Sequence, residues 1–547
     1  MKIRSDILRI YQSLHTWVGI GAGMLLFIGF FAGALTMFKE PLDRWVSAPT
    51  LRLQPVAPER LDTLVREVLE QRPAARKGFT LHLLEQENIP APLSWSADGG
   101  RGLNLSATRW HATLDDAGQL AEREQAPSQL AQLIDMLHRT GGIPGTVDGE
   151  YIGEYTMGVA GVMYFLALVS GLILLLPTLV KDFFALRAGK NRKRFWLDAH
   201  NVLGIASLPF HIVISLTVIV FAFHDQFYDS LGKVVYGAQP IFGKPPAAGA
   251  RPHAVADMLP ASALIAKVQG AAPDFLVSEL MFMRLETPRP MVRAAVVSPR
   301  HLSRGANSGF VMINPYDGTL DTSMLPGQGD VWSGIVAPLF ALHFGSFGGN
   351  LMRWVYFFLG LSGAFLFYSG NLLWVEKRRK NQGRNPLLVS QTRSTMLMAA
   401  ASVGITLGCM AGVGFSVVAG KWAHAAGGNI NLVYLQVYYA VFLGCVAWAF
   451  WRGAARSAAP LLKLCALSFL SIPLTSLAAA LLPSLGLWAN GSLAAVGVDL
   501  VALVSGLLML YAARRTARRV AQGPLDSVWS APPSAAGAAP QALAAKV

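Results

Sequence analysis

Charged residues are scarce in this sequence. Asp, Glu, Lys and Arg make up 14% of its 547 residues, and 53% of the residues are hydrophobic. Soluble globular proteins carry about 25% charged residues, so the composition excludes an ordinary soluble protein. A helix needs roughly 20 uncharged residues to cross a bilayer. The long charge-free runs therefore predict that most of the chain lies in lipid.

Cysteine is also rare. The three cysteines, Cys409, Cys445 and Cys465, fall inside predicted membrane spans and lack the spacing of a metal or redox site, so we interpret them as small core residues. No Cys-x-x-Cys-His motif occurs, which excludes covalent attachment of a c-type haem. No glycine-rich dinucleotide fingerprint occurs on a cytoplasmic segment, so a flavin domain is not expected.

The charge-free runs predict eight membrane spans. Seven runs carry them: residues 10–38, 155–180, 199–224, 354–375, 394–420, 422–451 and 464–498. Pro483 and Asn490 interrupt the last run, so an eighth span begins there and ends near Ala513. The first run is too long for a signal peptide and has no small-residue cleavage site before Lys39, so we expect it to remain as an anchor.

Basic residues outnumber acidic ones, 46 to 32, and give a net charge of +14. They gather before the first span and after every second span, for example at Lys181, Lys377, Arg452 and Arg514. Lys and Arg close to a span are retained in the cytoplasm, so we predict that both termini are cytoplasmic. The charge is therefore a topology signal, and no nucleic-acid partner is expected.

These boundaries predict a mainly α, polytopic membrane protein with about eight transmembrane helices and two α+β modules on the outer face. The expected segments are the cytoplasmic N-terminus with the first span (1–38), the first module (39–153), the second and third spans with a basic cytoplasmic loop between them (154–224), the second module (225–350), the fourth span (351–376), another basic cytoplasmic loop (377–393), spans five to eight (394–513) and a cytoplasmic tail (514–547). The end of the tail, residues 523–547, is rich in Ala and Pro and is expected to be disordered.

Each module is expected to combine a helix with strands. Apolar spacing predicts helices over residues 58–70 and 261–268. Extended patterns predict strands over residues 79–84, 103–114, 276–285 and 291–297, and a hairpin over 310–320 that turns at Asp317 and Gly318.

The first four spans and the modules look duplicated. Residues 113–120 match residues 312–320, and each pair of neighbouring spans opens in a similar way. His15 and His200 begin the first and third spans, whereas Leu-His pairs ending at His138 and His343 precede the second and fourth. Ser170-Gly171 and Ser369-Gly370 follow at corresponding places. A repeated unit of helix, module and helix explains this pattern.

Five histidines in or beside these spans are candidate ligands of haem iron: His15, His138, His200, His211 and His343. Two bis-histidine haems near opposite membrane faces would need four of them. The duplication favours one pair of His15 with His200 and another of His138 with His343. Glycines at Gly19, Gly204, Gly171 and Gly370 would let a porphyrin approach the backbone, although ordinary close helix packing explains any one of them equally well.

His211 leaves an alternative open. It follows His200 by eleven residues, which on one continuous helix places both rings on the same face at different depths. His211 would then replace His138 or His343 at the outer haem. The remaining histidines are interpreted as surface residues: His82, His111, His224, His253, His301 and His424.

Three segments resemble a known family. They are Leu14-His15-Thr16-Trp17-Val18-Gly19, the stretch from Asp198-Ala199-His200 to Leu208-Pro209-Phe210-His211, and Leu342-His343-Phe344-Gly345. In this order they resemble the PepSY-associated transmembrane-helix family of bacterial inner-membrane proteins, over roughly residues 5–380. The resemblance implies PepSY-like periplasmic modules and, as in some members, a di-haem helical core that reduces ferric siderophores after import. The four helices after Lys380 depart from the family pattern.

The expected function is that of an inner-membrane, haem-containing oxidoreductase. It would hold two b-type haems, take electrons from a quinol or another membrane donor, and pass them to a periplasmic acceptor such as a ferric siderophore. The alternative is a non-catalytic regulator or accessory protein whose PepSY-like modules bind a periplasmic partner. A transporter is disfavoured because the spans hold few ionisable residues apart from His211 and Asp499.

Overall fold

The computed structural model describes residues 4–48, 52–85, 89–96, 108–125, 128–147, 149–183, 186–187, 192–236, 252–298, 309–325, 331–381 and 389–531. The chain divides into two compact units. Unit 1 comprises residues 1–31, 166–208 and 361–547, and unit 2 comprises residues 32–165 and 209–360. The fold is mainly α with an antiparallel sheet, as the sequence predicts.

Seven helices in the described residues are long and apolar enough to cross a membrane. They are Ser5–Thr36 (α1), Ile152–Lys181 (α5 at Ile152–Leu175 with its short continuation), Gly349–Lys377 (α12), Arg393–Ala425 (α13), Ile430–Arg452 (α14), Ala454–Leu481 (α15) and Leu493–Gln522 (α16). An eighth candidate is a bent pair, α7 (Arg192–Ala206) and α8 (Leu208–Ala222). The protein is therefore a multi-pass membrane protein, and the eight predicted spans each have a counterpart.

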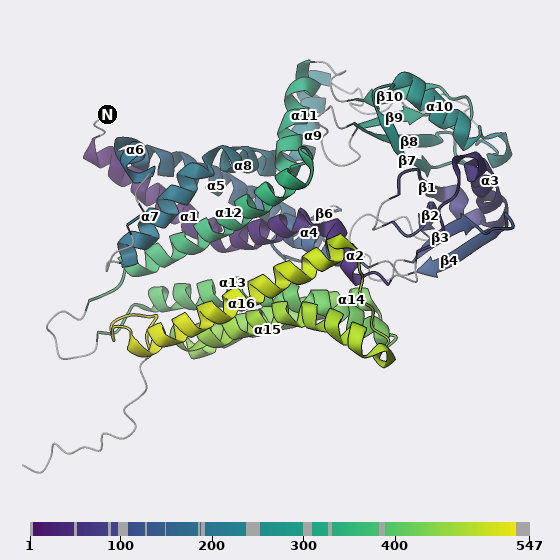
Figure 1. Cartoon of the computed structure of the whole chain (residues 1–547). Coiled ribbons are helices and arrows are strands. Elements are labelled where there is room, and N and C mark those ends of the chain that lie inside the picture. The colour runs from purple at the N-terminus through teal and green to yellow at the C-terminus, as the bar shows by residue number, and fades with distance from the viewer. Residues whose placement is uncertain are drawn as a thin grey trace, which may run out of the picture. The chain divides into compact units, whose positions relative to one another are not determined.

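The four helices α13 to α16 pack together in unit 1 (Figure 1). Glycines let α13 approach α14: a Cβ on Gly404 would lie 2.9 Å from the Val446 Cα, and one on Gly408 would lie 3.0 Å from the Phe442 carbonyl oxygen. Small residues four apart are a usual means of close packing between helices in lipid. Ile20 of α1 packs on the same core cluster, so the added helices belong to one unit with parts of the earlier spans.

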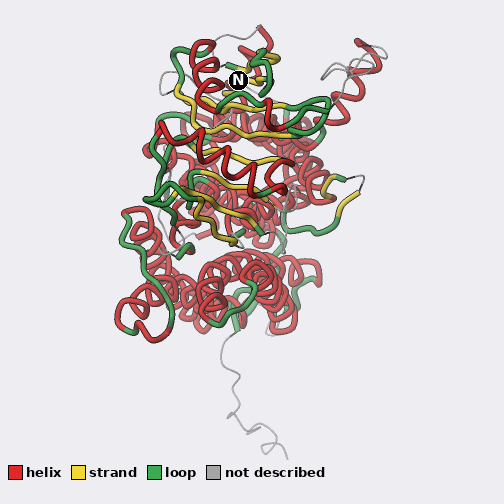
Figure 2. The backbone as a smooth tube through the Cα atoms, turned by 90° about the vertical axis from the view of Figure 1, so that its right-hand side faces the viewer, coloured by secondary structure: helices red, strands yellow, loops and turns green. Residues whose placement is uncertain are grey.

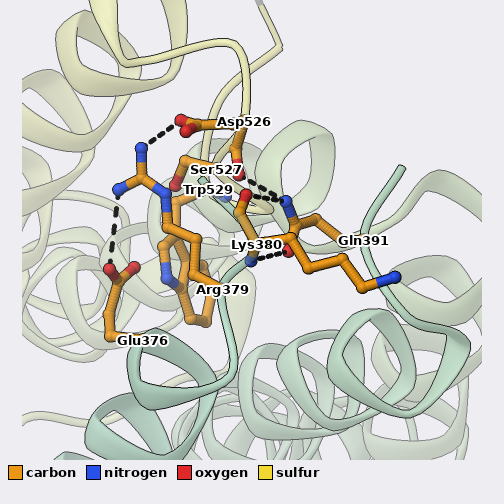
Figure 3. Close-up of polar contacts among 7 residues, drawn as sticks. All are labelled: Glu376, Arg379, Lys380, Gln391, Asp526, Ser527 and Trp529. Atoms are coloured by element: carbon orange, nitrogen blue, oxygen red, sulfur yellow. Dashed lines mark hydrogen bonds and ion pairs between the residues drawn. The ribbon is translucent and has the colours of Figure 1, made fainter. Parts of the chain in front are cut away.

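The start of the tail is ordered against the loop after α12 (Figure 3). Arg379 pairs with both Glu376 and Asp526, and the Gln391 side chain donates to the Asp526 carbonyl oxygen at 2.8 Å. Trp529 packs on the neighbouring core cluster. The expectation of disorder from residue 523 onward is therefore wrong for residues 523–531, because these polar and aromatic contacts hold them. Residues 532–547 lie outside the described part.

The sheet of unit 2 joins both predicted modules. Its eight antiparallel strands run in the order β10-β9-β8-β7-β1-β2-β3-β4. Their bounds are Gly78–His82 (β1), Leu93–Ser96 (β2), Arg109–Leu114 (β3), Leu120–Gln125 (β4), Leu276–Met283 (β7), Met291–Val297 (β8), Gly309–Ile313 (β9) and Leu320–Met324 (β10). The two halves meet where β1 pairs with β7, with Leu81 opposite Leu280. The repeat predicted from sequence therefore forms one sheet, because each half has an edge strand that the other can complete.

Two helices cover one face of this sheet, α3 (Leu61–Gln71) and α10 (Ala261–Ala271), as Figures 1 and 2 show. Alternate residues on the strands, such as Phe79, Leu81, Leu280 and Phe282, are buried beneath them. Period-two alternation is what a strand with one covered face requires. We call α3, α10 and these eight strands the sheet module.

The matched ends of the two halves both form hairpins, of which the sequence predicted the one over residues 310–320. Asp115 N–H donates to the Gln119 carbonyl at 2.9 Å, and Asn314 N–H donates to the Thr319 carbonyl at 2.9 Å. Gly118 and Gly318 adopt positive φ in the two turns. The sequence did not predict β2 and β4, and residues 103–107 of the strand predicted over 103–114 lie outside the described part.

Unit 2 also contains four further α-helices, α2 (Lys39–Val46), α4 (Leu130–Thr140), α9 (His224–Leu231) and α11 (Val331–Phe344), and a two-stranded sheet of β5 (Thr146–Val147) and β6 (Glu150–Tyr151). Helices α4 and α11 directly precede the candidate spans α5 and α12. The Leu-His pair that ends at His138 lies in the last turn of α4, and the pair that ends at His343 lies in the last turn of α11.

Candidate functional site

Two of the five candidate histidines meet in unit 1. His15 lies on α1 and His200 on α7, and their ring centroids are 6.4 Å apart with an angle of 84° between the ring planes. The duplication predicted that these two residues occupy equivalent places. The structure brings their rings together from different helices.

Hydrogen bonds at Nδ1 fix the tautomer of both rings. His15 Nδ1 lies 2.8 Å from the Ala167 carbonyl oxygen, which can only accept, so Nδ1 carries the proton. His200 Nδ1 lies 2.9 Å from the Ser369 hydroxyl, which itself donates to the Leu366 carbonyl at 3.0 Å. That hydroxyl therefore accepts from His200. In both rings Nε2 is left with an unprotonated lone pair, the form in which histidine binds a metal.

A second pair lies in unit 2. His138 of α4 and His343 of α11 have ring centroids 6.2 Å apart and an angle of 43° between the ring planes. His343 Nδ1 lies 2.6 Å from the Thr217 hydroxyl, which donates to the Val213 carbonyl at 2.7 Å. His343 therefore also donates through Nδ1 and keeps a lone pair on Nε2.

Both centroid distances fit a metal ion held between two imidazoles. A histidine nitrogen binds a metal at about 2.0 Å, and it lies about 1.15 Å from its ring centre because ring bonds are about 1.33 Å long. Two rings facing one ion from opposite sides would then have centroids about 6.3 Å apart. The observed values of 6.4 and 6.2 Å lie on either side of this distance.

Glycines provide the space that the rings occupy. A Cβ on Gly171 would lie 3.0 Å from His15 Cε1, and one on Gly33 would lie 2.7 Å from His138 Nδ1. Any side chain at Gly33 would force His138 to move. One turn after His15, a Cβ on Gly19 would have no heavy atom within 4 Å, and after His200 a Cβ on Gly204 would meet only Leu366 at 3.8 Å. A Cβ at either position would therefore meet little or no neighbouring structure.

His211 occupies a different environment. It is 0% exposed, and its Nδ1 is hydrogen-bonded to the Tyr164 hydroxyl. The helix expected to carry His200 and His211 on one face is broken at Ser207, where α7 and α8 meet at a bend of 71°. The inference that the two rings share a helix face is therefore wrong. Tyr164 supplies the polar partner that a buried imidazole needs.

The histidines interpreted as surface residues differ among themselves. His224, His253 and His424 are exposed. His111 is a buried residue of β3, and His82 of β1 is half-buried, so the surface interpretation is wrong for His111. Alternate side chains of a strand point to opposite faces, so the strand predicted here could have indicated that His111 lies on a face of the sheet. His301 lies outside the described residues.

Sequence reasoning also missed Lys421. It is 0% exposed near the end of α13, and its Nζ donates to the Trp488 carbonyl oxygen at 3.1 Å. The spans therefore hold more ionisable groups than expected, although this lysine is accounted for as an anchor of the loop between α15 and α16. The three cysteines are free thiols and buried, as predicted.

Within the described part of the chain, no group of three or more His, Cys, Asp or Glu residues could hold a metal ion. Each histidine pair thus offers a metal only two protein ligands. In a comparison with known families, a family model described as "PepSY-associated TM region" matches residues 12–377. No curated protein matches the chain.

Proposed function

The chain belongs to the family of the PepSY-associated TM region, whose model covers its first four spans and both halves of the sheet module, and we propose that its two histidine pairs hold two b-type haems. His15 and His200 would bind one haem iron, and His138 and His343 the other. The protein would be an oxidoreductase of the bacterial inner membrane that passes electrons from a quinol or another membrane donor to a periplasmic acceptor, with a ferric siderophore as the expected substrate.

The centroid distances of 6.4 and 6.2 Å carry this proposal. Two imidazoles alone coordinate a bare metal ion poorly, since structural metal sites in proteins use four or more ligands. A porphyrin supplies the other four, so a pair of histidines is a complete protein contribution for haem iron. Bound haem would supply one-electron redox chemistry. Without Cys-x-x-Cys-His, it would be held non-covalently.

The chain's own residues would keep the ligands neutral and oriented. The Ala167 carbonyl, the Ser369 hydroxyl and the Thr217 hydroxyl accept the Nδ1 protons of His15, His200 and His343. Such outer partners fix the ring orientation and raise the basicity of the metal-binding nitrogen. Gly33 and Gly171 leave the rings their space.

We predict that the detergent-purified protein is coloured. Its absorption spectrum should show a Soret band that sharpens when dithionite reduces the sample, and the haem should extract into acidified organic solvent. The expected stoichiometry is two haems per chain. A colourless, correctly folded preparation from haem-replete cells would exclude this proposal and favour a non-catalytic regulator that binds a periplasmic partner.

We also predict that both termini are cytoplasmic and that the sheet module lies in the periplasm. The reason is that the opposite orientation would move the basic loops after α5 and α12 to the wrong face. Reporter fusions after Arg123 and after Gly318 should be active in periplasmic assays, whereas a fusion after Gln522 should be active in cytoplasmic ones. A cytoplasmic signal at Arg123 or Gly318 would reverse the topology and the direction of electron flow.

A further inference from the structure

The face of the sheet opposite α3 and α10 carries a row of mostly polar residues, interrupted by one methionine. The strand register places six residues side by side across it: Arg123, His111, Ser94, Thr80, Met281 and Arg293. In the next row, His82 lies opposite Glu279. Since successive residues of a strand point to opposite faces, Arg109 shares the face of His111.

His111 is the most unusual member of this row. It is 3% exposed, and neither ring nitrogen has a hydrogen-bond partner among the described residues. A buried polar atom without a hydrogen bond destabilises the folded state, and His111 has two such atoms. Because both ring nitrogens lack a partner within the described part of the chain, a ligand bound on this face can form a hydrogen bond with His111.

Arginine side chains share the face of the sheet that carries His111. Arg109 and Arg293 both interact electrostatically with Glu279, which is the carboxylate that the two arginines share. His82 lies 3.5 Å from Glu279 and 3.1 Å from the Ser94 hydroxyl. Among the described strand residues, Arg109, Arg123 and Arg293 share this face with His111, so an anionic ligand can form ion pairs there.

We propose that this face of the sheet binds a small carboxylate-bearing anion with at least two carboxylates. The guanidinium groups of Arg109 and Arg293 pair with the carboxylates, because planar guanidinium forks match carboxylate geometry. His111 donates an N–H to the same ligand. The site is separate from the haem proposal, since none of these residues belongs to a histidine pair.

Citrate is a suitable probe, and isothermal titration calorimetry on the full-length, detergent-purified protein at neutral pH tests the site. Saturable binding of about one citrate per chain is expected. Arg109→Gln and Arg293→Gln should each weaken binding at least tenfold, and His111→Phe should weaken it severalfold. Trimethyl citrate, which lacks the charges, should not bind.

Arg66→Gln is the matched control, because Arg66 is an exposed arginine of α3 on the opposite side of the sheet. It should bind citrate as the wild type does. Circular dichroism of every variant verifies the fold. Absence of saturable binding by the wild type, or unchanged affinity in both Arg109→Gln and Arg293→Gln, would overturn the inference. Neither result bears on haem content, which the absorption spectrum measures.

Discussion

Replacing His200 by Ala is expected to halve the haem content of the purified protein. The His200 ring is one of two that meet at 6.4 Å in unit 1, and removing it leaves His15 as the single protein ligand there. The pair of His138 and His343 belongs to the other unit and should keep its haem. His343→Ala should therefore also lose about half, and the double variant should lose nearly all. Haem per protein, measured by extraction, checks each value.

His211 and His424 serve as controls for this series. His211 is hydrogen-bonded to Tyr164, so His211→Phe should retain both haems even though it changes a buried residue. His424 is exposed at the end of α13, and His424→Ala should behave as the wild type. Loss of half the haem in His211→Phe, with full retention in His343→Ala or in His138→Ala, would assign His211 to the second haem. Full haem content in all the variants would refute the ligand assignment.

Acidification should weaken the sheet module through His111. Burial, with smaller electrostatic contributions from Arg109 and His82, lowers the pKa of His111 from 6.5 to about 4. The unfolded strand therefore takes up a proton at a pH where the folded strand does not. The stability that His111 contributes as a neutral residue is present above pH 6.5 and is lost as the pH falls toward 4. A shift of this size corresponds to about 3 kcal/mol.

Hydrogen exchange of the β2 and β3 amides, corrected for the intrinsic pH dependence of exchange, measures this effect. The opening free energy of these strands should fall by about 2–3 kcal/mol between pH 7 and pH 4 in the wild type. It should change much less in His111→Leu. His253→Leu alters an exposed histidine and should retain the wild-type slope. An equal fall in wild type and His111→Leu would show that other groups cause the acid sensitivity.

The sequence alone determined the membrane architecture. Runs free of charge predicted the spans, because hydrocarbon excludes charged side chains whatever they pack against. Local turn chemistry also predicted the hairpin at Asp317 and Gly318, since a short turn depends on its own residues. The duplication in the sequence also relates His15 to His200 and His138 to His343.

Only the tertiary structure decided which segments meet. The pairing of β1 with β7 joins residues almost 200 positions apart, and no local pattern specifies it. The break at Ser207 separates His200 from His211, although the run through it reads as one apolar helix. Tyr164, Ser369 and Thr217 become partners of histidines through packing, and His111 is buried only in the folded sheet module. Hydropathy and periodicity describe how a segment meets lipid or water, whereas these contacts depend on side chains that distant segments supply.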